Sequence, residues 1–505
     1  MKCSFEKAFT LCLMLVTVLK FAAACVEPSI EIRNIGLDQL QLKSLVNSRE
    51  QLLYISYTGD SLEIKLPHRQ IFIDTKKIPY VCLNEEDNWS VNGIEVPNAF
   101  SNNKSELPLV GVSSDGYLLL NDQKTHFLVT QSNLPNDTHN DEILACVQSE
   151  SYLYLYGYDN KIASLPIVKN KDHIIPDYFF DMVVEKEKLA EAVINSISTE
   201  NCCSYVFFTD AHWQNNQQHS PAIIKHIVDY SPVKNVLFGG DAITDKTETT
   251  QEAIDIGCAF QKSFDYLGPH LYCLFGNHDD NSCGQASLTY RHLSEEQVYS
   301  FLQSQMTDVH YWDYYNFYFD DPVSKTRFLC FDTGRWYESS LRESTLKTAK
   351  FTIEALNAVP VGWHIIAASH IWTSLKSFDS VDSFESPFVR PIIEILENYN
   401  KRMKTSFIFG DSTIDYDFSS AGAAVEYCIG GHTHADTVVT SQKGIPLISI
   451  TCDGQQEVAG RAPFQTGTIN EQCVTIIVNN YQEREILVYH IGRGRDINVK
   501  MWSQV

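Results

Sequence analysis

The stretch Tyr272–Asn281 reads "YCLFGNHDDN", an apolar run followed directly by a glycine, a carboxamide, an imidazole and two carboxylates. The apolar run is typical of a buried strand. Glycine and asparagine tolerate positive φ, so the polar part fits an ordinary turn as well as it fits a functional site. The rest of the chain decides between these two interpretations.

Two segments upstream show the same change from apolar to polar residues. "SYVFFTDAH", residues 204–212, predicts a strand that ends in polar groups, and "VKNVLFGGDAITD", residues 233–245, predicts another. Between them, "SPAIIKHIVDYSP" begins with the Ser-Pro pair typical of a helix start. This order predicts a β-α-β unit with parallel strands, whose ligands lie beyond the carboxyl ends of the strands.

Five polar clusters follow apolar runs in the second half of the chain. Asp-x-His and His-x-His place two side chains on the same side of an extended segment, where both can reach one ion or two adjacent ions. The clusters are Asp210 and His212 in "FTDAHW", Asp241 in "GGDAITD", Asn277 and His278 in "GNHDD", His370 in "AASHIW", and His432 and His434 in "GGHTHAD".

In this order the five clusters resemble the calcineurin-like metallophosphoesterase superfamily, with its pattern D-x-H, G-D, G-N-H-[DE], H and G-H-x-H. The resemblance extends over roughly residues 203–495 and implies a four-layer αββα sandwich of the α/β class. It also implies a hydrolase of phosphoric esters, either a phosphatase or a phosphodiesterase. A single histidine of this set would more often be structural, but eight ligand-type or acid-type residues in this order favour a site.

The resemblance also implies a role for each residue. Two divalent or trivalent ions, drawn from Mn, Fe, Zn or Co, suit a site of imidazoles and carboxylates. A hydroxide held between the ions is then the nucleophile. The implied ligands are Asp210, His212 and His434 for one ion, Asn277, His370 and His432 for the other, and Asp241 as the bridge.

His278 is implied to be the acid that donates a proton to the leaving oxygen, with Asp279 placed to orient it. Asp245 either supports His278 or caps the following helix, and the cap is the favoured interpretation. Trp213, Trp372 and the asparagines at 215 and 216 are candidates to line the pocket, although rim packing is the more common use of such aromatic residues.

Three branches of the superfamily fit less well. Purple acid phosphatases carry a tyrosine three residues after the bridging aspartate, where this chain has Thr244. Ser/Thr phosphatases place an arginine just after the Asn-His-Asp/Glu motif, whereas the nearest arginine here is Arg291. Secreted nucleotidases have the catalytic domain first, and this chain has the opposite order. The substrate is therefore left as a small phosphomonoester or phosphodiester.

The N-terminus predicts export. Lys2 and Lys7 precede the apolar run "FTLCLMLVTVL", and "KFAAAC" ends at Cys25 with small residues typical of a cleavage site. This ending resembles a bacterial lipobox with Ala22 in place of the usual leucine. A lipid-anchored protein of the periplasm or cell surface is therefore favoured over a secreted one. The net charge of −24 argues against bulk binding of nucleic acid.

The expected domains are a signal peptide at 1–25, a β-rich accessory region at 26–165, a helical linker at 166–202 and the phosphoesterase domain at 203–505. Residues 88–122 resemble small β-modules of exported proteins of Bacteroides-like bacteria. An alternative hypothesis is a surface binding protein that acts through this region and has a vestigial metal site. The cysteines beyond the signal are scattered in apolar runs, which favours buried thiols and leaves one or two disulfides open.

Overall fold

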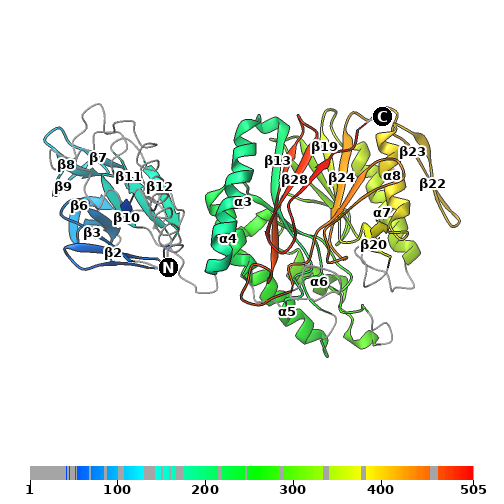
Figure 1. Ribbon diagram of the computed structural model, residues 1–505, viewed down its shortest axis with the longest axis horizontal. Coiled ribbons are helices and arrows are strands. Elements are labelled where there is room, and N and C mark those ends of the chain that lie inside the picture. The colour runs from blue at the N-terminus through cyan, green and yellow to red at the C-terminus, as the bar shows by residue number, and fades with distance from the viewer. Residues whose placement is uncertain are drawn as a thin grey trace, which may run out of the picture. The chain divides into compact units, whose positions relative to one another are not determined.

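The chain divides into two units, Met1–Val168 and Lys169–Val505, in the computed structural model (Figure 1). Each unit is described by itself. The described residues are 41–42, 45, 52, 54–66, 70–84, 88–100, 107–129, 143–148, 152–157, 161–166, 175–213, 219–244, 247–283, 288–333, 341–376, 383–454 and 464–503. The predicted signal peptide and Cys25 lie outside them.

The first unit is rich in strands, as predicted. Its core contains Trp89, and side chains of β8 are alternately buried and half-buried, which is the period of a strand with one covered face. One sheet has the order β1-β2-β3, with β1 (Tyr54–Tyr57), β2 (Ser61–Lys65) and β3 (Gln70–Asp74). A second has the order β12-β11-β10-β4-β5-β6, with β12 (Lys161–Pro166), β11 (Tyr152–Tyr156), β10 (Ala145–Gln148), β4 (Tyr80–Leu83), β5 (Asn88–Val91) and β6 (Ile94–Phe100). The third is β7-β8-β9, with β7 (Val110–Val112), β8 (Tyr117–Leu120) and β9 (Gln123–Leu128).

The first sheet of the second unit is mixed. Its order is β15-β14-β13-β27-β28-β29, and β13, β14 and β15 are parallel while β27 runs antiparallel to β13. Near the C-terminus, β27 and β28 also pair antiparallel. The strands are β13 (Cys202–Phe208), β14 (Asn235–Phe238), β15 (Leu271–Cys273), β27 (Cys473–Asn480), β28 (Glu485–Gly492) and β29 (Ile497–Lys500).

The second sheet has the order β16-β17-β18-β19-β24-β26-β25, in which β18, β19, β24 and β26 are parallel. Its strands are β16 (His310–Tyr311), β17 (Phe317–Asp321), β18 (Thr326–Phe331), β19 (His364–Ser369), β24 (Ala424–Gly430), β25 (Thr437–Thr440) and β26 (Pro446–Ser449). Two separate ribbons are β20 (Thr373–Leu375) with β21 (Ser383–Glu385), and β22 (Lys404–Phe409) with β23 (Ser412–Asp417).

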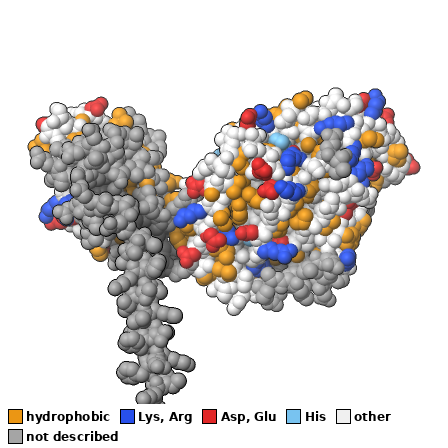
Figure 2. Space-filling view, turned by 45° about the horizontal axis from the view of Figure 1, so that its top comes forward, with side chains coloured by type: hydrophobic (Ala, Val, Ile, Leu, Met, Phe, Trp, Pro, Cys, Tyr) orange, Lys and Arg blue, Asp and Glu red, His pale blue; other side chains and the backbone are white. Residues whose placement is uncertain are grey.

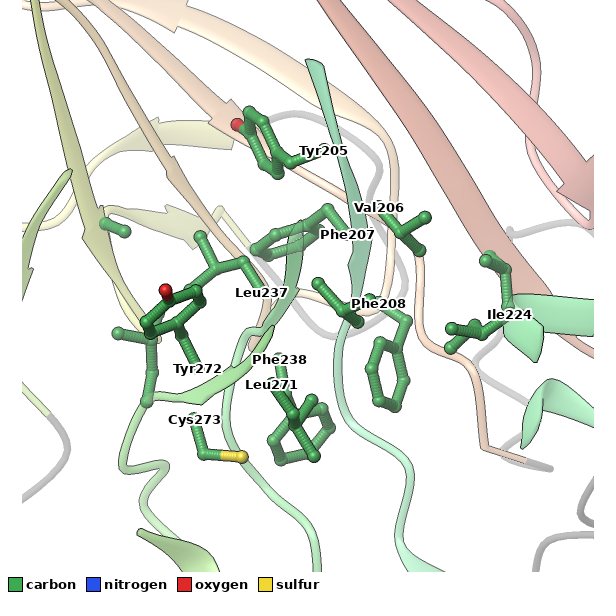
Figure 3. Packing of buried hydrophobic residues seen from close by; sticks show 14 of the residues in the cluster. Tyr205, Val206, Phe207, Phe208, Ile224, Leu237, Phe238, Leu271, Tyr272 and Cys273 are labelled. Carbon is green, nitrogen blue, oxygen red and sulfur yellow. The ribbon is translucent and has the colours of Figure 1, made fainter. Parts of the chain in front are cut away.

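The two sheets pack face to face and are covered by helices on their outer faces, which confirms the predicted four-layer arrangement. On β18, Phe328 belongs to the core shared with the first sheet, while Leu329 and Phe331 belong to the core under the outer helices. On β13, Tyr205 bonds to Tyr427 of the facing sheet, and Phe208 packs outward (Figure 3). The helices are α3 (Asp177–Ser196), α4 (Ser220–Tyr230), α5 (Thr250–Ser263), α6 (Glu295–Leu302), α7 (Leu341–Asn357) and α8 (Arg390–Asn400).

Helix α3 falls in the segment that the sequence predicts as a linker. Its apolar residues Phe179, Val183 and Ala190 are buried in the core of the second unit, where the helix packs on β27 and β28. Helical spacing of those residues gives the helix one apolar stripe, and this stripe covers the sheet. The helix is therefore part of the outer layer, while the predicted domain boundaries stay predictions.

The cysteines from Cys82 to Cys473 are all free, so none of them forms the disulfides that the sequence left open. Basic and acidic side chains are interspersed on the face of the second unit seen in Figure 2. In the part of the chain that the structure describes, no helix combines the length and hydrophobicity needed to span a membrane.

Candidate metal centre

Five strands from two sheets deliver the predicted site residues to one edge of the sandwich. β13, β14 and β15 end just before Asp210, Asp241 and Asn277, and β19 and β24 end just before His370 and His432. Parallel strands place their carboxyl ends at the same edge of a sheet, so these residues meet although up to 222 positions separate those in contact. The residues that the strand-end signal singled out therefore lie together in the structure.

The backbone of this edge is strained. Asp210, His212, Asp241, His432 and His434 all have φ between 43° and 65°, in the left-handed region that residues with a Cβ rarely occupy. Such conformations persist only where the surrounding structure enforces them, and they cluster at functional sites. The residue pattern alone does not predict these left-handed conformations.

Two glycines allow the loops to approach one another. A Cβ at Gly276 would lie 2.1 Å from Asp241 Oδ1, and a Cβ at Gly431 would lie 2.0 Å from Thr209 Oγ1. Both distances are far shorter than any carbon contact, so glycine is required at these positions. The glycines of "GNHDD" and "GGHTH" thus bring the ligand loops together rather than only turning the chain.

Asp210, His212 and His434 form one compact group whose ligand atoms lie within 4.8 Å of one another. His434 Nε2 is 3.1 Å from Asp210 Oδ1 and 3.4 Å from His212 Nε2. Thr209, which the sequence did not single out, donates its hydroxyl to Asp210 Oδ2 at 2.8 Å. The three residues predicted for one ion are therefore side by side.

Asp210, Asp241 and His370 form a second compact group. His370 Nε2 lies 3.1 Å from Asp241 Oδ2 and 3.7 Å from Asp210 Oδ1. The sequence predicts Asp241 alone as the bridge, whereas here Asp210 is common to both groups. The remaining predicted ligands lie beside this group, since Asn277 Oδ1 is 2.9 Å from His432 Nδ1 and the rings of His370 and His432 are 5.4 Å apart.

Charge interactions keep the two carboxylates ionised. Burial raises the pKa of Asp210, but His370 and His434 outweigh burial and hold the pKa below its usual value. Burial likewise opposes ionisation of Asp241, and His370 and His278 hold its pKa well below the usual range. Two buried anions are thus available as ligands.

The histidines fall into two electrostatic classes. Burial lowers the pKa of His212 to about 4 and that of His432 to about 3, so both rings are neutral ligands at neutral pH. Burial also acts against the charged forms of His370 and His434. For His370, Asp241 and Asp210 reverse this and raise the pKa to about 9. For His434, Cys452 and Asp210 raise the pKa to about 10.

The arrangement fits two metal ions. The buried atoms Asp210 Oδ1 and His370 Nε2 make no hydrogen bond, although both face the other members of their groups. Buried polar atoms are rarely left in this state, and a cation would satisfy both. The donor set of carboxylate, imidazole and carboxamide suits Mn, Fe, Zn or Co, as the sequence predicts.

His278 lies at the edge of this site with a side chain that is 23% exposed. Its backbone N–H donates to Asp241 Oδ1 at 2.8 Å, its Nε2 lies 3.8 Å from Asp241 Oδ2, and its ring is 5.2 Å from the ring of His212. The ring is thus held beside the ligands while part of it remains open to solvent.

Asp279 has different partners from those predicted. It is fully buried, and both of its oxygens accept hydrogen bonds from the loops that carry Gly276 and Asp241. Burial and the charge of Asp241 raise its pKa to about 7. Its donors are the backbone N–H groups of Gly276, Asp241, Ala242 and Ile243, at 2.8, 3.0, 2.7 and 3.3 Å. Through these contacts Asp279 joins two ligand loops. Its predicted role in orienting His278 stays a prediction.

The remaining candidates lie away from the ligands or outside the described residues. Trp213 packs in the core against Phe260, and Trp372 donates Nε1–H to the Ile429 carbonyl at 2.9 Å. Both tryptophans are therefore packing residues. Helix α5 is capped by Thr249, whose side chain accepts from Glu252 N. The predicted cap Asp245 and the asparagines at 215 and 216 lie outside the described residues.

One further segment beside the site, Thr451–Gly454, was missed. It follows strand β26, and Gly454 N donates to the Asp210 carbonyl at 2.9 Å. The sequence signal was the same as elsewhere, since the apolar run "IPLISI" precedes "TCDG". The segment contains no histidine, so it did not fit the strand-end pattern of the predicted ligands.

Residues 204–436 match the family described as calcineurin-like phosphoesterase. No curated protein matches the chain. Among solved structures, the chain is similar to a dimetal phosphatase from Danio rerio, with 12% identity, a TM-score of 0.38, and coverage of 59% of this chain and 99% of that one.

Proposed function

We propose that this metal-dependent phosphoester hydrolase, whose residues 204–436 match the family described as calcineurin-like phosphoesterase, is exported and hydrolyses a small phosphomonoester or phosphodiester. The observation that supports this most is the convergence of two carboxylates and four imidazoles from five strand ends at one strained edge. A purely structural cluster would not need so many residues in left-handed conformations.

The proposal assigns the ligands to two metal ions. Asp210, His212 and His434 would hold one ion, Asn277, His370 and His432 would hold the other, and Asp241 would serve both. When bound, two ions of this kind activate a water molecule for in-line attack and offset the charge that develops on the phosphoryl oxygens. The neutral rings of His212 and His432 complete the set without adding charge.

His278 is the proton donor in this proposal. A general acid must be within reach of the leaving oxygen, and His278 combines a fixed backbone with partial exposure at the edge of the ligand groups. Its Nε2, 3.8 Å from Asp241 Oδ2, is the proton-donating atom in this proposal. Departure of the alcohol then leaves His278 neutral, and solvent restores its proton.

A direct test uses metal-loaded protein and two chromogenic substrates, a phosphomonoester and a phosphodiester. The proposal expects hydrolysis of at least one of them by the parent protein and loss of hydrolysis in Asp241→Ala. Hydrolysis that survives Asp241→Ala contradicts the mechanism. Hydrolysis of neither substrate, with turnover of a carboxylic ester instead, contradicts the substrate class.

The proposal for localisation rests on residues 1–25 alone. A basic start, an apolar run and "AAAC" support export with lipid attachment at Cys25. Expression in a bacterial host with labelled palmitate tests it, since incorporation is expected in the parent and lost in Cys25→Ala. Unlabelled protein in the culture medium supports plain secretion and contradicts the lipid anchor.

A further inference from the structure

Strand β28 is another strand of the first sheet whose carboxyl end lies at the edge of the metal centre. β27 runs antiparallel to β13, and β28 runs antiparallel to β27, so β28 is parallel to β13 and ends at the same edge. Near that end it carries His490, in a part of the chain outside the matched residues 204–436. His490 is 2% exposed and is not one of the predicted ligands, so its buried ring must serve another purpose.

The ring of His490 bonds to Asp436, which is buried and lies two positions after the proposed ligand His434. The distance between His490 Nε2 and Asp436 Oδ1 is 2.9 Å, and the imidazole is the donor because a carboxylate only accepts. Asp436 Oδ1 also accepts from Thr451 N at 3.0 Å, and its Oδ2 accepts from Arg495 N at 3.3 Å. Three donors from β28, from the turn after it and from the segment after β26 therefore hold this carboxylate.

The turn after β28 encloses the pair formed by Asp436 and His490. Asp496 Oδ1 accepts from His490 N at 2.9 Å, which ties the turn to the strand. A Cβ at Gly494 would lie 2.7 Å from Asp436 Oδ2 and would also overlap the ring of His490, so only glycine allows this close approach. The pair is therefore confined as well as hydrogen-bonded.

The loop that carries Asp436 brings a ligand of the second sheet to two ligands of the first sheet. His434 follows β24, whereas Asp210 and His212 follow β13. His434 Nε2 lies 3.1 Å from Asp210 Oδ1 and 3.4 Å from His212 Nε2. One ligand group is thus built from both sheets, so its dimensions depend on how the two sheets are held together at this edge.

Thr451 holds the same loop from the second sheet. Its Oγ1 donates to the His434 carbonyl at 3.0 Å, while its N–H donates to Asp436. Partners of this kind, next to the ligands of a metal ion, fix the ligand geometry. We infer that Asp436, His490 and Thr451 are positioning residues, which hold the ligand loop of the second sheet at the distance from the first sheet that one metal ion requires.

The inference rests on the proposed metal site, so the metal content of the parent protein and its affinity for each ion are measured first. If the parent binds no metal after reconstitution, the proposed function and this inference both fail. If the parent binds two equivalents and the variants below keep both affinities, only this inference fails.

The test uses two matched pairs of variants. His490→Gln keeps an N–H donor in the side chain and His490→Met removes it, while Thr451→Ser keeps the hydroxyl group and Thr451→Val replaces it with a methyl group. Competition with a chelator gives the affinity for each ion, and His212→Ala identifies which affinity belongs to the group that contains His434. We expect His490→Met and Thr451→Val to weaken that ion by about 10- to 100-fold and to leave the other unchanged. We expect His490→Gln and Thr451→Ser to keep most of the parent's affinity.

Thr326→Val is the control for a general loosening of the sandwich. Thr326 Oγ1 and Tyr481 OH are both buried and lie 2.7 Å apart, and they join the two sheets at the opposite edge, where β18 begins and β27 ends. We expect Thr326→Val to lower the free energy of unfolding of the metal-free protein in urea while both metal affinities stay as in the parent. Weakening of the same ion to the same extent as in Thr451→Val would overturn the inference, because loss of stability alone would then explain the effect.

Cobalt-loaded protein supplies a second readout. We expect the ligand-field spectrum of one cobalt ion to change in His490→Met and Thr451→Val and to match the parent in His490→Gln and Thr451→Ser. Equal affinities and equal spectra within both pairs would overturn the inference. If His490→Met does not fold, the Thr451 pair decides by the same two measurements.

Discussion

Single residues at this site adopt conformations that side chains ordinarily avoid. Asp210, Asp241 and His432 each have a positive φ, at a cost of roughly 1–3 kcal/mol per residue. The loops carrying Asp210 and Asp241 are held by backbone hydrogen bonds, since Asp210 N donates to the Gly240 carbonyl and His212 N donates to the Asp241 carbonyl. The strain is thus shared among neighbouring loops, so a small change in one loop should shift the ligand residues of another.

Gly276→Ala is predicted to weaken metal binding. The added methyl group would overlap Asp241 Oδ1 at 2.1 Å, so the loop must move away from the ligand. Metal titration should show weaker binding of at least one ion, whereas Gly111→Ala, with no atom within 4 Å of the new Cβ, should bind as the parent does. Unchanged metal affinity in Gly276→Ala would show that the approach of the two loops is not required.

Asp279→Asn is predicted to lower the free energy of unfolding of the metal-free protein by about 1–3 kcal/mol. An asparagine amide cannot accept the backbone N–H groups that one carboxylate oxygen now receives. Denaturant unfolding measures this loss. If stability and metal content stay unchanged while only turnover falls, Asp279 acts on His278 as the sequence predicts, and its structural role is minor.

At the scale of elements, the sequence predicts well wherever an apolar run ends in a glycine and polar residues. That signal is local, because a buried strand and its turn are encoded by adjacent residues. In the structure the predicted ligands all follow strand ends. That signal could not give the positive φ of Asp210 or the hydrogen bonds that backbone N–H groups donate to the Asp279 carboxylate. Both depend on loops that are distant in sequence. The ribbons β20–β21 and β22–β23 were also not foreseen, since they are short insertions without a clear period.

The contact between the two sheets gives a prediction at this scale. Tyr205 and Tyr427 are buried, and their hydroxyl groups are 2.8 Å apart across the interface. Tyr205→Phe and Tyr427→Phe should each reduce the free energy of unfolding by about 1–3 kcal/mol, because a buried hydroxyl loses its partner. The double variant should lose clearly less than the sum of the two. Strict additivity in urea unfolding would mean that the two hydroxyl groups do not interact.

The molecule contains one segment that matches a known family and other segments that lie outside that match. Residues beyond 436 supply β25 to β29, and they complete both sheets and pack Thr451–Gly454 on the ligand loops. The first unit is β-rich, as predicted, but the residues of the metal centre all come from the second unit. The net charge of −24 favours a substrate that is small or neutral outside its phosphate.

The central claim is that the five strand ends build a dinuclear hydrolytic site with a separate proton donor. The most direct measurement is elemental analysis of protein lacking residues 1–25, together with phosphodiester turnover in the parent, Asp241→Ala and His278→Ala. The account predicts about two transition-metal equivalents in the parent, fewer in Asp241→Ala, and full metal content with lost turnover in His278→Ala. Absence of both metal and turnover after reconstitution with Mn, Fe or Zn would contradict it, and the first unit would then become the place to look for function.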